Sequence, residues 1–113
     1  MTTQLDRAAA LAARWWADRL KQGDGARLIT VLQPKIRAEL EKQGRVYLEN
    51  DYDPKGILLD AVREIGIECR GCLFSGDGIF PRKHSLYVYP DRLEPKEGYG
   101  HWVDLIPVLP TLT

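Results

Sequence analysis

The sequence has 113 residues, of which 44% are hydrophobic and 28% charged, enough to bury one hydrophobic core and too few for two. Its formal net charge is zero, which argues against a general nucleic-acid binder, usually strongly basic, and against an acidic protein that imitates DNA. No apolar run approaches the roughly 20 residues that span a bilayer, and the N-terminus lacks a secretory signal pattern. We therefore expect a cytoplasmic protein that forms a single domain over residues 1–113.

Two helices are predicted in the first part of the chain. Apolar residues recur at spacings of three and four over residues 4–21 and again over residues 28–40, as on the buried face of a helix. Trp15 and Trp16 point about 100° apart on a helix, so we expect one of them to be partly exposed. Pro34 cannot donate the helical hydrogen bond and predicts a kink or a restart, and Gly44 suits the helix end.

The second part of the chain predicts one more helix and the strands. Residues 45–49 alternate as in a short strand. Asp53 and Pro54 form a typical helix start, with Asp53 as the cap, and an apolar stripe then continues to Gly66. The glycine-rich residues 71–78 indicate a mobile loop, followed by a strand at 86–89, a turn at Pro90 and Asp91, and a last strand at 102–106.

The order of these elements favours an α+β fold. Because helices precede most strands, we expect two to three N-terminal and central helices packed on one face of a small antiparallel sheet. The C-terminal half of the chain would form most of that sheet.

The cysteines suggest metal or redox chemistry only weakly. Cys69 and Cys72 have a C-x-x-C spacing, which can present two thiolates to a zinc ion or form a redox pair. A structural zinc ion needs four ligands, and His84 and His101 are not spaced as a second pair. Two unconnected thiols are the simpler interpretation, and we expect no metal and no cofactor.

Catalytic residues are not recognisable in the sequence. His84 with Ser85, or His101 with Ser75 and Asp77, would supply a base and a nucleophile, but no G-x-S-x-G context surrounds either serine. We therefore expect a protein that is not an enzyme.

Three acids form a distinctive short pattern. Glu49, Asp51 and Asp53 alternate along the chain, but the glycine and the twelfth-position acid of a calcium loop are missing. We interpret them as an exposed acidic rim, with Asp53 also capping a helix, and the rim would suit a basic partner surface.

Two further segments and the overall charge distribution indicate contact surfaces. Residues 80–84 place Arg82 and Lys83 beside an aromatic residue, and residues 98–102 form a glycine-rich turn beside aromatic residues. Residues 1–45 hold nine Lys/Arg against five Asp/Glu, whereas residues 46–113 hold seven against eleven. These opposite poles would steer a partner or a second copy, as in a homodimer, if they are more than solvated helix faces.

A resemblance to a known group covers most of the chain. Four segments carry it: Trp15-Trp16-Ala17-Asp18, Asp51-Tyr52-Asp53-Pro54 before a helix that ends at Gly66-Ile67, Phe80-Pro81-Arg82-Lys83, and Gly98-Tyr99-Gly100. In this order they resemble a group of small proteins encoded by bacteriophages and prophages. Small phage proteins of this kind often inhibit host defence, and anti-CRISPR proteins are the best-known class.

The resemblance implies a stoichiometric inhibitor of a bacterial CRISPR–Cas effector that blocks nucleic-acid engagement or nuclease recruitment. We expect its partner to be a host Cas protein, bound in the host cytoplasm without a membrane or direct nucleic-acid contact. The residues predicted to bind it are Glu49, Asp51, Tyr52, Asp53, Arg82, Lys83, Tyr99 and Trp102.

Two alternatives remain open. A regulatory nucleic-acid binder would use the basic half of the chain, whose candidates are Arg27, Lys35, Arg37, Lys42 and Arg45. A small zinc-dependent protein or enzyme would use Cys69 and Cys72.

Overall fold

The computed structural model describes residues 3–21, 23–51, 53–67, 79–80, 83–98 and 104–109. Its helices are α1 (Gln4–Ala17), α2 (Gly25–Gln43) and α3 (Gly56–Glu64). Its strands are β1 (Val46–Asp51), β2 (Asp53–Pro54), β3 (Lys83–Val88), β4 (Arg92–Glu97) and β5 (Ile106–Pro107). Among these residues no helix combines the length and apolar character needed to cross a membrane.

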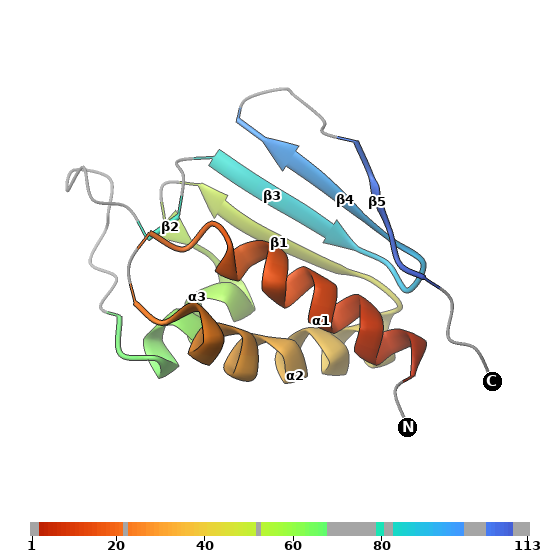
Figure 1. The fold of residues 1–113 in the computed structure, drawn as a ribbon, viewed down its shortest axis with the longest axis horizontal. Helices are drawn as coiled ribbons and strands as arrows, with labels where there is room; N and C mark the ends of the chain where they lie inside the picture. Colours follow the sequence, from red (N-terminus) through yellow and green to blue (C-terminus); the bar gives the residue numbers. More distant parts are fainter. Residues whose placement is uncertain are drawn as a thin grey trace.

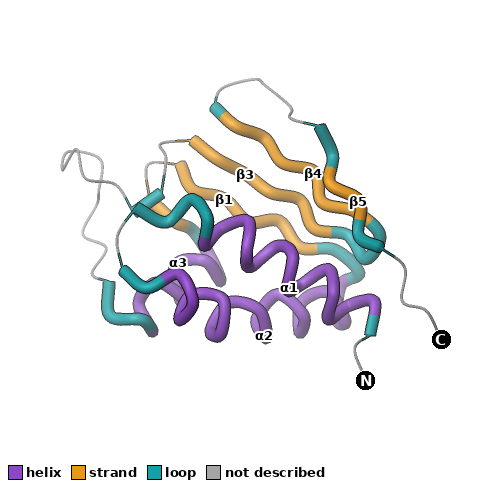
Figure 2. Tube along the Cα trace, in the orientation of Figure 1, coloured by secondary structure: helices purple, strands orange, loops and turns teal. Residues whose placement is uncertain are grey.

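The strands form one antiparallel sheet in the order β2-β1-β3-β4-β5. In the register, Leu48 lies opposite Leu86, and Leu86 lies opposite Pro95. Figure 1 shows α1, α2 and α3 together on one side of this sheet, and Figure 2 shows the same two layers as purple helices and orange strands. The predicted α+β class, with helices on one face of a sheet from the C-terminal half, is confirmed.

The core lies between the two layers. Small residues of α1, including Ala8, Ala9 and Ala12, are fully buried, which lets α2 approach closely. Larger side chains fill the space toward the sheet: Trp16, Leu28, Leu32, Ile36, Leu40, Leu48, Leu58, Phe80, Leu86 and Leu93. Burial of this apolar surface supplies the main stabilisation of the fold.

Short polar contacts fix where the first two helices begin. Thr3 and Asp6 form a reciprocal capping box at the start of α1, which stabilises the first-turn N–H groups. Asp24 accepts hydrogen bonds from the backbone of Ala26 and Arg27 at the start of α2. Gly44 then ends α2 in the left-handed conformation, at a φ of 79°, as its position in the sequence predicted.

The predicted restart of the helix at Pro34 is absent, and α2 runs from Gly25 to Gln43 as one helix. Pro34 lies on the exposed side of α2, where water can hydrogen-bond the carbonyl group that loses its partner. Leu32 and Ile36 on the opposite side are fully buried. The packing of this buried stripe outweighs the missing hydrogen bond.

The predicted helix cap at Asp53 is wrong. Asp53 and Pro54 form β2, in which Asp53 lies opposite Asp51. The Lys55 backbone N–H donates to the Glu49 carbonyl at 3.0 Å, which closes this tight hairpin. Helix α3 therefore begins only at Gly56, with Lys55 at the N-cap position and no side-chain cap.

The last strands also differ from the prediction. Strand β4 was not predicted, because it is mostly charged and contains Pro95, which is typical only of edge strands and bulges. The strand expected at 102–106 overlaps β5 only at Ile106; Asp104 and Leu105 lie outside it, and 102–103 lie outside the described residues. β5 has two residues, Ile106 and Pro107, which lie opposite Leu93 and Arg92 of β4.

Candidate functional site

The face of the sheet that points away from the helices is the candidate site. On β1, Val46, Leu48 and Asn50 are buried toward the helices, so the alternating residues Tyr47 and Glu49 point to the other side. No described helix covers that side (Figure 1). Side chains of β1, β3 and β4 are therefore presented together on an open surface.

Three tyrosines form a continuous aromatic strip on this open surface. Tyr47 and Tyr87 lie opposite each other on β1 and β3, with ring centroids 4.5 Å apart. Tyr87 and Tyr89 are stacked with centroids 6.5 Å apart, and the Arg92 guanidinium lies 4.0 Å from the Tyr89 ring centroid. Tyr47 is 46% exposed. We call Tyr47, Tyr87, Tyr89 and Arg92 the tyrosine face.

An ionic cluster lies farther along the same strands. Lys83 Nζ is 3.0 Å from Asp51 Oδ2 and 3.3 Å from Glu49 Oε1, because strand pairing places Asp51 directly opposite Lys83. The hydrogen bond to Asp51, aided by Glu49, raises the pKa of Lys83 above its usual value. Lys83 is therefore a fixed cation between two acids.

The open surface carries charges of both signs, with one more acid than bases. Alternation along the strands and the pairing of Asp53 with Asp51 place on it the acids Glu49, Asp51, Asp53 and Glu94 together with Lys83, Lys96 and Arg92. Arg92 also lies 2.9 Å from Asp91 and 3.4 Å from Glu94. Such a surface does not have the electrostatic signature of a polyanion-binding site.

The structure brings together only part of the predicted binding set. Glu49, Asp51, Asp53 and Lys83 lie at the same end of the β1, β2 and β3 strands. Lys83 of the predicted basic segment pairs with Glu49 and Asp51 of the predicted acidic rim. The other predicted residues lie outside the described part of the chain: Tyr52, Arg82, Tyr99 and Trp102.

The prediction that Trp15 or Trp16 is partly exposed is wrong, since they are 6% and 0% exposed. Their rings meet edge to face with centroids 4.8 Å apart. Trp16 packs against Phe80, with centroids 5.1 Å apart, and the Arg19 guanidinium covers Trp15 at 3.7 Å from its ring centroid. The two side chains point in different directions from α1, and both are covered by neighbouring residues.

A polar cluster that the sequence did not predict lies beside Trp15, on the helix side of the sheet. Arg19 Nη2 is 2.8 Å from Glu97 Oε1, and His84 Nε2 is 3.9 Å from the same oxygen. His84 also lies 6.0 Å from Trp15, ring centroid to centroid. Burial is the main cause that lowers the pKa of His84, so this histidine is neutral at pH 7.

Over the described residues, the fold does not bring together the catalytic or metal-binding side chains that were considered from the sequence. His84 and Ser85 are neighbours on β3 and point to opposite faces of the sheet. Over the described ranges, no three His, Cys, Asp or Glu side chains are grouped so that they could hold a metal ion. Cys69, Cys72, Ser75, Asp77 and His101 lie outside those ranges.

The basic half of the chain is partly neutralised. Arg37 pairs with both Asp6 and Glu41, and Lys35 Nζ lies 3.3 Å from Glu64 Oε2. Two of the cations proposed for nucleic-acid contact are therefore already engaged.

No protein-family model matches the sequence, and comparisons with curated proteins and with solved structures likewise find no match.

Proposed function

We propose that this protein is a stoichiometric protein-binding inhibitor of a bacterial CRISPR–Cas effector and that the tyrosine face makes its central contact. The supporting observation is the aromatic strip of Tyr47, Tyr87 and Tyr89 on the side of the sheet that no described helix covers. Tyrosine and arginine are enriched at protein interfaces, because they bury a large area and still offer polar groups. The inhibitor would act by occlusion and not as an enzyme.

The charges around the tyrosines favour a protein as the partner. The open surface carries four acids and three bases, and Lys83 and Arg92 are already paired with neighbouring carboxylates. A polar border around an aromatic centre is the usual anatomy of a protein interface. It gives a partner charges of both signs to match.

The choice of a CRISPR–Cas effector comes from the sequence resemblance to small phage and prophage proteins. Binding of the tyrosine face would cover a surface on which a Cas protein engages nucleic acid or recruits a nuclease. The acidic rim of Glu49, Asp51 and Asp53 would lie toward basic residues of that surface. Such a partner would be met in the cytoplasm of a bacterial host.

The deciding experiment measures the plaquing efficiency of a targeted phage on CRISPR-immune bacteria that express this protein. The panel covers several CRISPR types, and a non-targeted phage serves as control. We expect plaquing to be restored in one type, and the effector of that type to co-elute with the protein. Loss of both effects in a Tyr47→Ala, Tyr87→Ala variant that remains folded would attribute them to the tyrosine face. Unchanged immunity in every type would contradict inhibition of these effectors.

Single-stranded nucleic-acid binding is a second candidate, because bases stack well on aromatic side chains of an open sheet. It predicts that a fluorescent single-stranded oligonucleotide binds the wild-type protein and is released steeply by salt. The excess of acids over bases on the surface weighs against it. Binding that survives the loss of Tyr47 and Tyr87 would exclude the tyrosine face as its site.

A further inference from the structure

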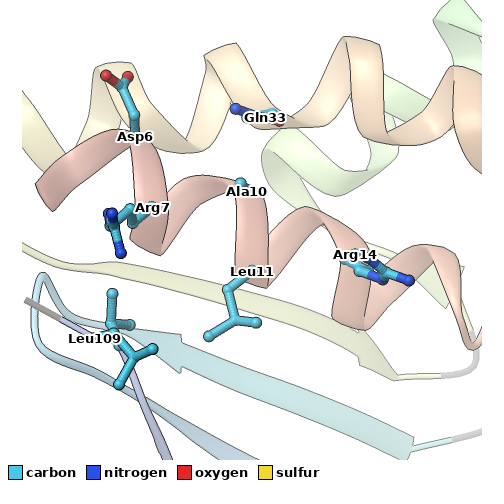
Figure 3. A pocket seen from close by; sticks show the side chains of 8 residues that line it. Asp6, Arg7, Ala10, Leu11, Arg14, Gln33 and Leu109 are labelled. Carbon is cyan, nitrogen blue, oxygen red and sulfur yellow. The ribbon is translucent and has the colours of Figure 1, made fainter. Parts of the chain in front are cut away.

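A groove on the helix side of the molecule is separate from the tyrosine face. Its volume is about 690 Å³, and Figure 3 shows that α1 forms its floor while Leu109 lies on one side and Gln33 of α2 on the other. Arg7, Ala10, Leu11 and Arg14 follow a spacing of three and four residues, so they share one face of α1.

The groove carries two unpaired cations. Over the described part of the chain, neither Arg7 nor Arg14 makes an ion pair, whereas the remaining ionic residue of the lining, Asp6, is bound to Arg37 at 2.8 Å. The Arg7 Nε atom is buried and has no hydrogen-bond acceptor. A buried donor without an acceptor carries a desolvation cost that a bound carboxylate would relieve.

The space between the two arginines is apolar. Leu11 lies between Arg7 and Arg14 on α1 and is half-buried, and Leu109 on the facing wall is 70% exposed. Along the groove, an apolar centre therefore lies between two cations.

We propose that this groove binds an acidic amphipathic helix of a partner protein. Seven residues at 1.5 Å each separate Arg7 and Arg14 by about 10.5 Å along the axis of α1. Acids seven positions apart on a second helix have the same separation, with apolar residues at the third and fourth positions between them. On an extended strand, residues of one face repeat at about 6.6 Å or 13 Å instead, so a helix fits better. The inference does not depend on the CRISPR target.

The test titrates ¹⁵N,¹³C-labelled protein with a helical peptide of roughly 15 residues that has glutamates seven positions apart and leucines between them. We expect NMR shifts at the Arg7 and Arg14 side chains and at the methyl groups of Leu11 and Leu109. A matched peptide with glutamines in place of the glutamates should bind roughly tenfold more weakly, because it lacks the charge-assisted hydrogen bonds.

Variants of the protein test the assignment to the groove. Arg7→Glu with Arg14→Glu should abolish binding of the glutamate peptide and acquire binding of a lysine version. Arg27→Gln with Lys42→Gln, which removes two exposed positive charges of α2 that lie outside the groove, should bind like the wild type. Circular dichroism verifies that each variant folds. If a variant does not fold, the comparison of the glutamate and glutamine peptides on the wild-type protein still tests the role of charge.

Three results would overturn the proposal. These are no shift at the groove residues at millimolar peptide, equal binding of the glutamate and glutamine peptides, and displacement of the peptide by a thymidine 15-mer at lower concentration. The last result would assign the groove to phosphate groups.

Discussion

Lys83 and Asp51 lie directly opposite each other on β3 and β1 and form an ion pair of 3.0 Å. Both belong to the predicted contact surface, one as part of a basic segment and the other as part of the acidic rim. Because the same lysine also lies 3.3 Å from Glu49, the rim contains its own counter-ion. A basic partner must compete with Lys83 for these carboxylates. The contact therefore contributes more to the specificity of binding than to its affinity.

Reversing the acidic rim tests its role in binding. Substituting lysine for Glu49, Asp51 and Asp53 should weaken binding to the effector and reduce its salt dependence, since charges of opposite sign no longer meet. The measurement is affinity at low and high salt, with unfolding curves to verify the fold. A matched control reverses three acids outside the sheet: Asp18, Glu39 and Asp60. Equal affinities for the rim variant and the wild type would remove the rim from the interface.

Replacing Tyr47 separates binding from stability. Tyr47 is 46% exposed, so Tyr47→Ser should change the free energy of unfolding by only about 1 kcal/mol, the worth of a cross-strand pair. As an interface anchor it should cost tenfold or more in affinity, roughly 1.4 kcal/mol. Tyr47→Phe keeps the ring and should retain most of the affinity. A serine variant that inhibits as well as the wild type would place the contact elsewhere.

The class of fold could be predicted from the sequence because the spacing of apolar residues along the chain shows which side of each helix or strand is buried. The stripes of α1, α2 and α3 repeat at helical spacing, and Gly44 and Gly66 take positive φ values where the predicted helices end. Asp53 misled the prediction, since the same residue type favours both a helix cap and a tight hairpin. Only the pairing of β2 with β1 decides between them.

The candidate site was less accessible to sequence reasoning. Tyr47 and Tyr87 are forty positions apart, and their contact depends on the β1–β3 register. Arg19, His84 and Glu97 likewise meet only through the packing of α1 on the sheet. The spacing of residues along the chain does not reveal contacts between distant segments. The spacing of Tyr87 and Tyr89 did indicate that these two residues lie on the same face of one strand.

Pro34 offers a stabilising substitution. It lies in the interior of α2 on the exposed side, where proline costs about 3 kcal/mol relative to alanine. Alanine restores the missing hydrogen bond but gives the unfolded chain more freedom, worth up to about 1 kcal/mol. Pro34→Ala should therefore raise the free energy of unfolding by roughly 2 kcal/mol, as measured by urea unfolding. A decrease would show that the freedom gained by the unfolded chain outweighs the restored hydrogen bond.

His84 should make the fold sensitive to mild acid. Its pKa is lowered mainly by burial, and the nearby Arg19 lowers it further, while the Lys83 backbone and Glu97 act in the opposite direction. The unfolded chain has the ordinary histidine pKa of about 6.5 and so binds a proton at a pH where the folded protein does not. Protonation therefore favours unfolding, and stability falls as the pH drops from above 6.5 toward the lowered pKa of the folded state.

Urea unfolding of the wild type and of His84→Gln at several pH values between 7.5 and 5 measures this contribution. The variant should lose part of the decline in stability toward low pH, because glutamine does not titrate. The carboxylate of Asp6 has a pKa lowered from 3.8, so it stays ionised in this range and does not interfere. Identical pH profiles would show that His84 takes up its proton equally well in the folded and unfolded chains.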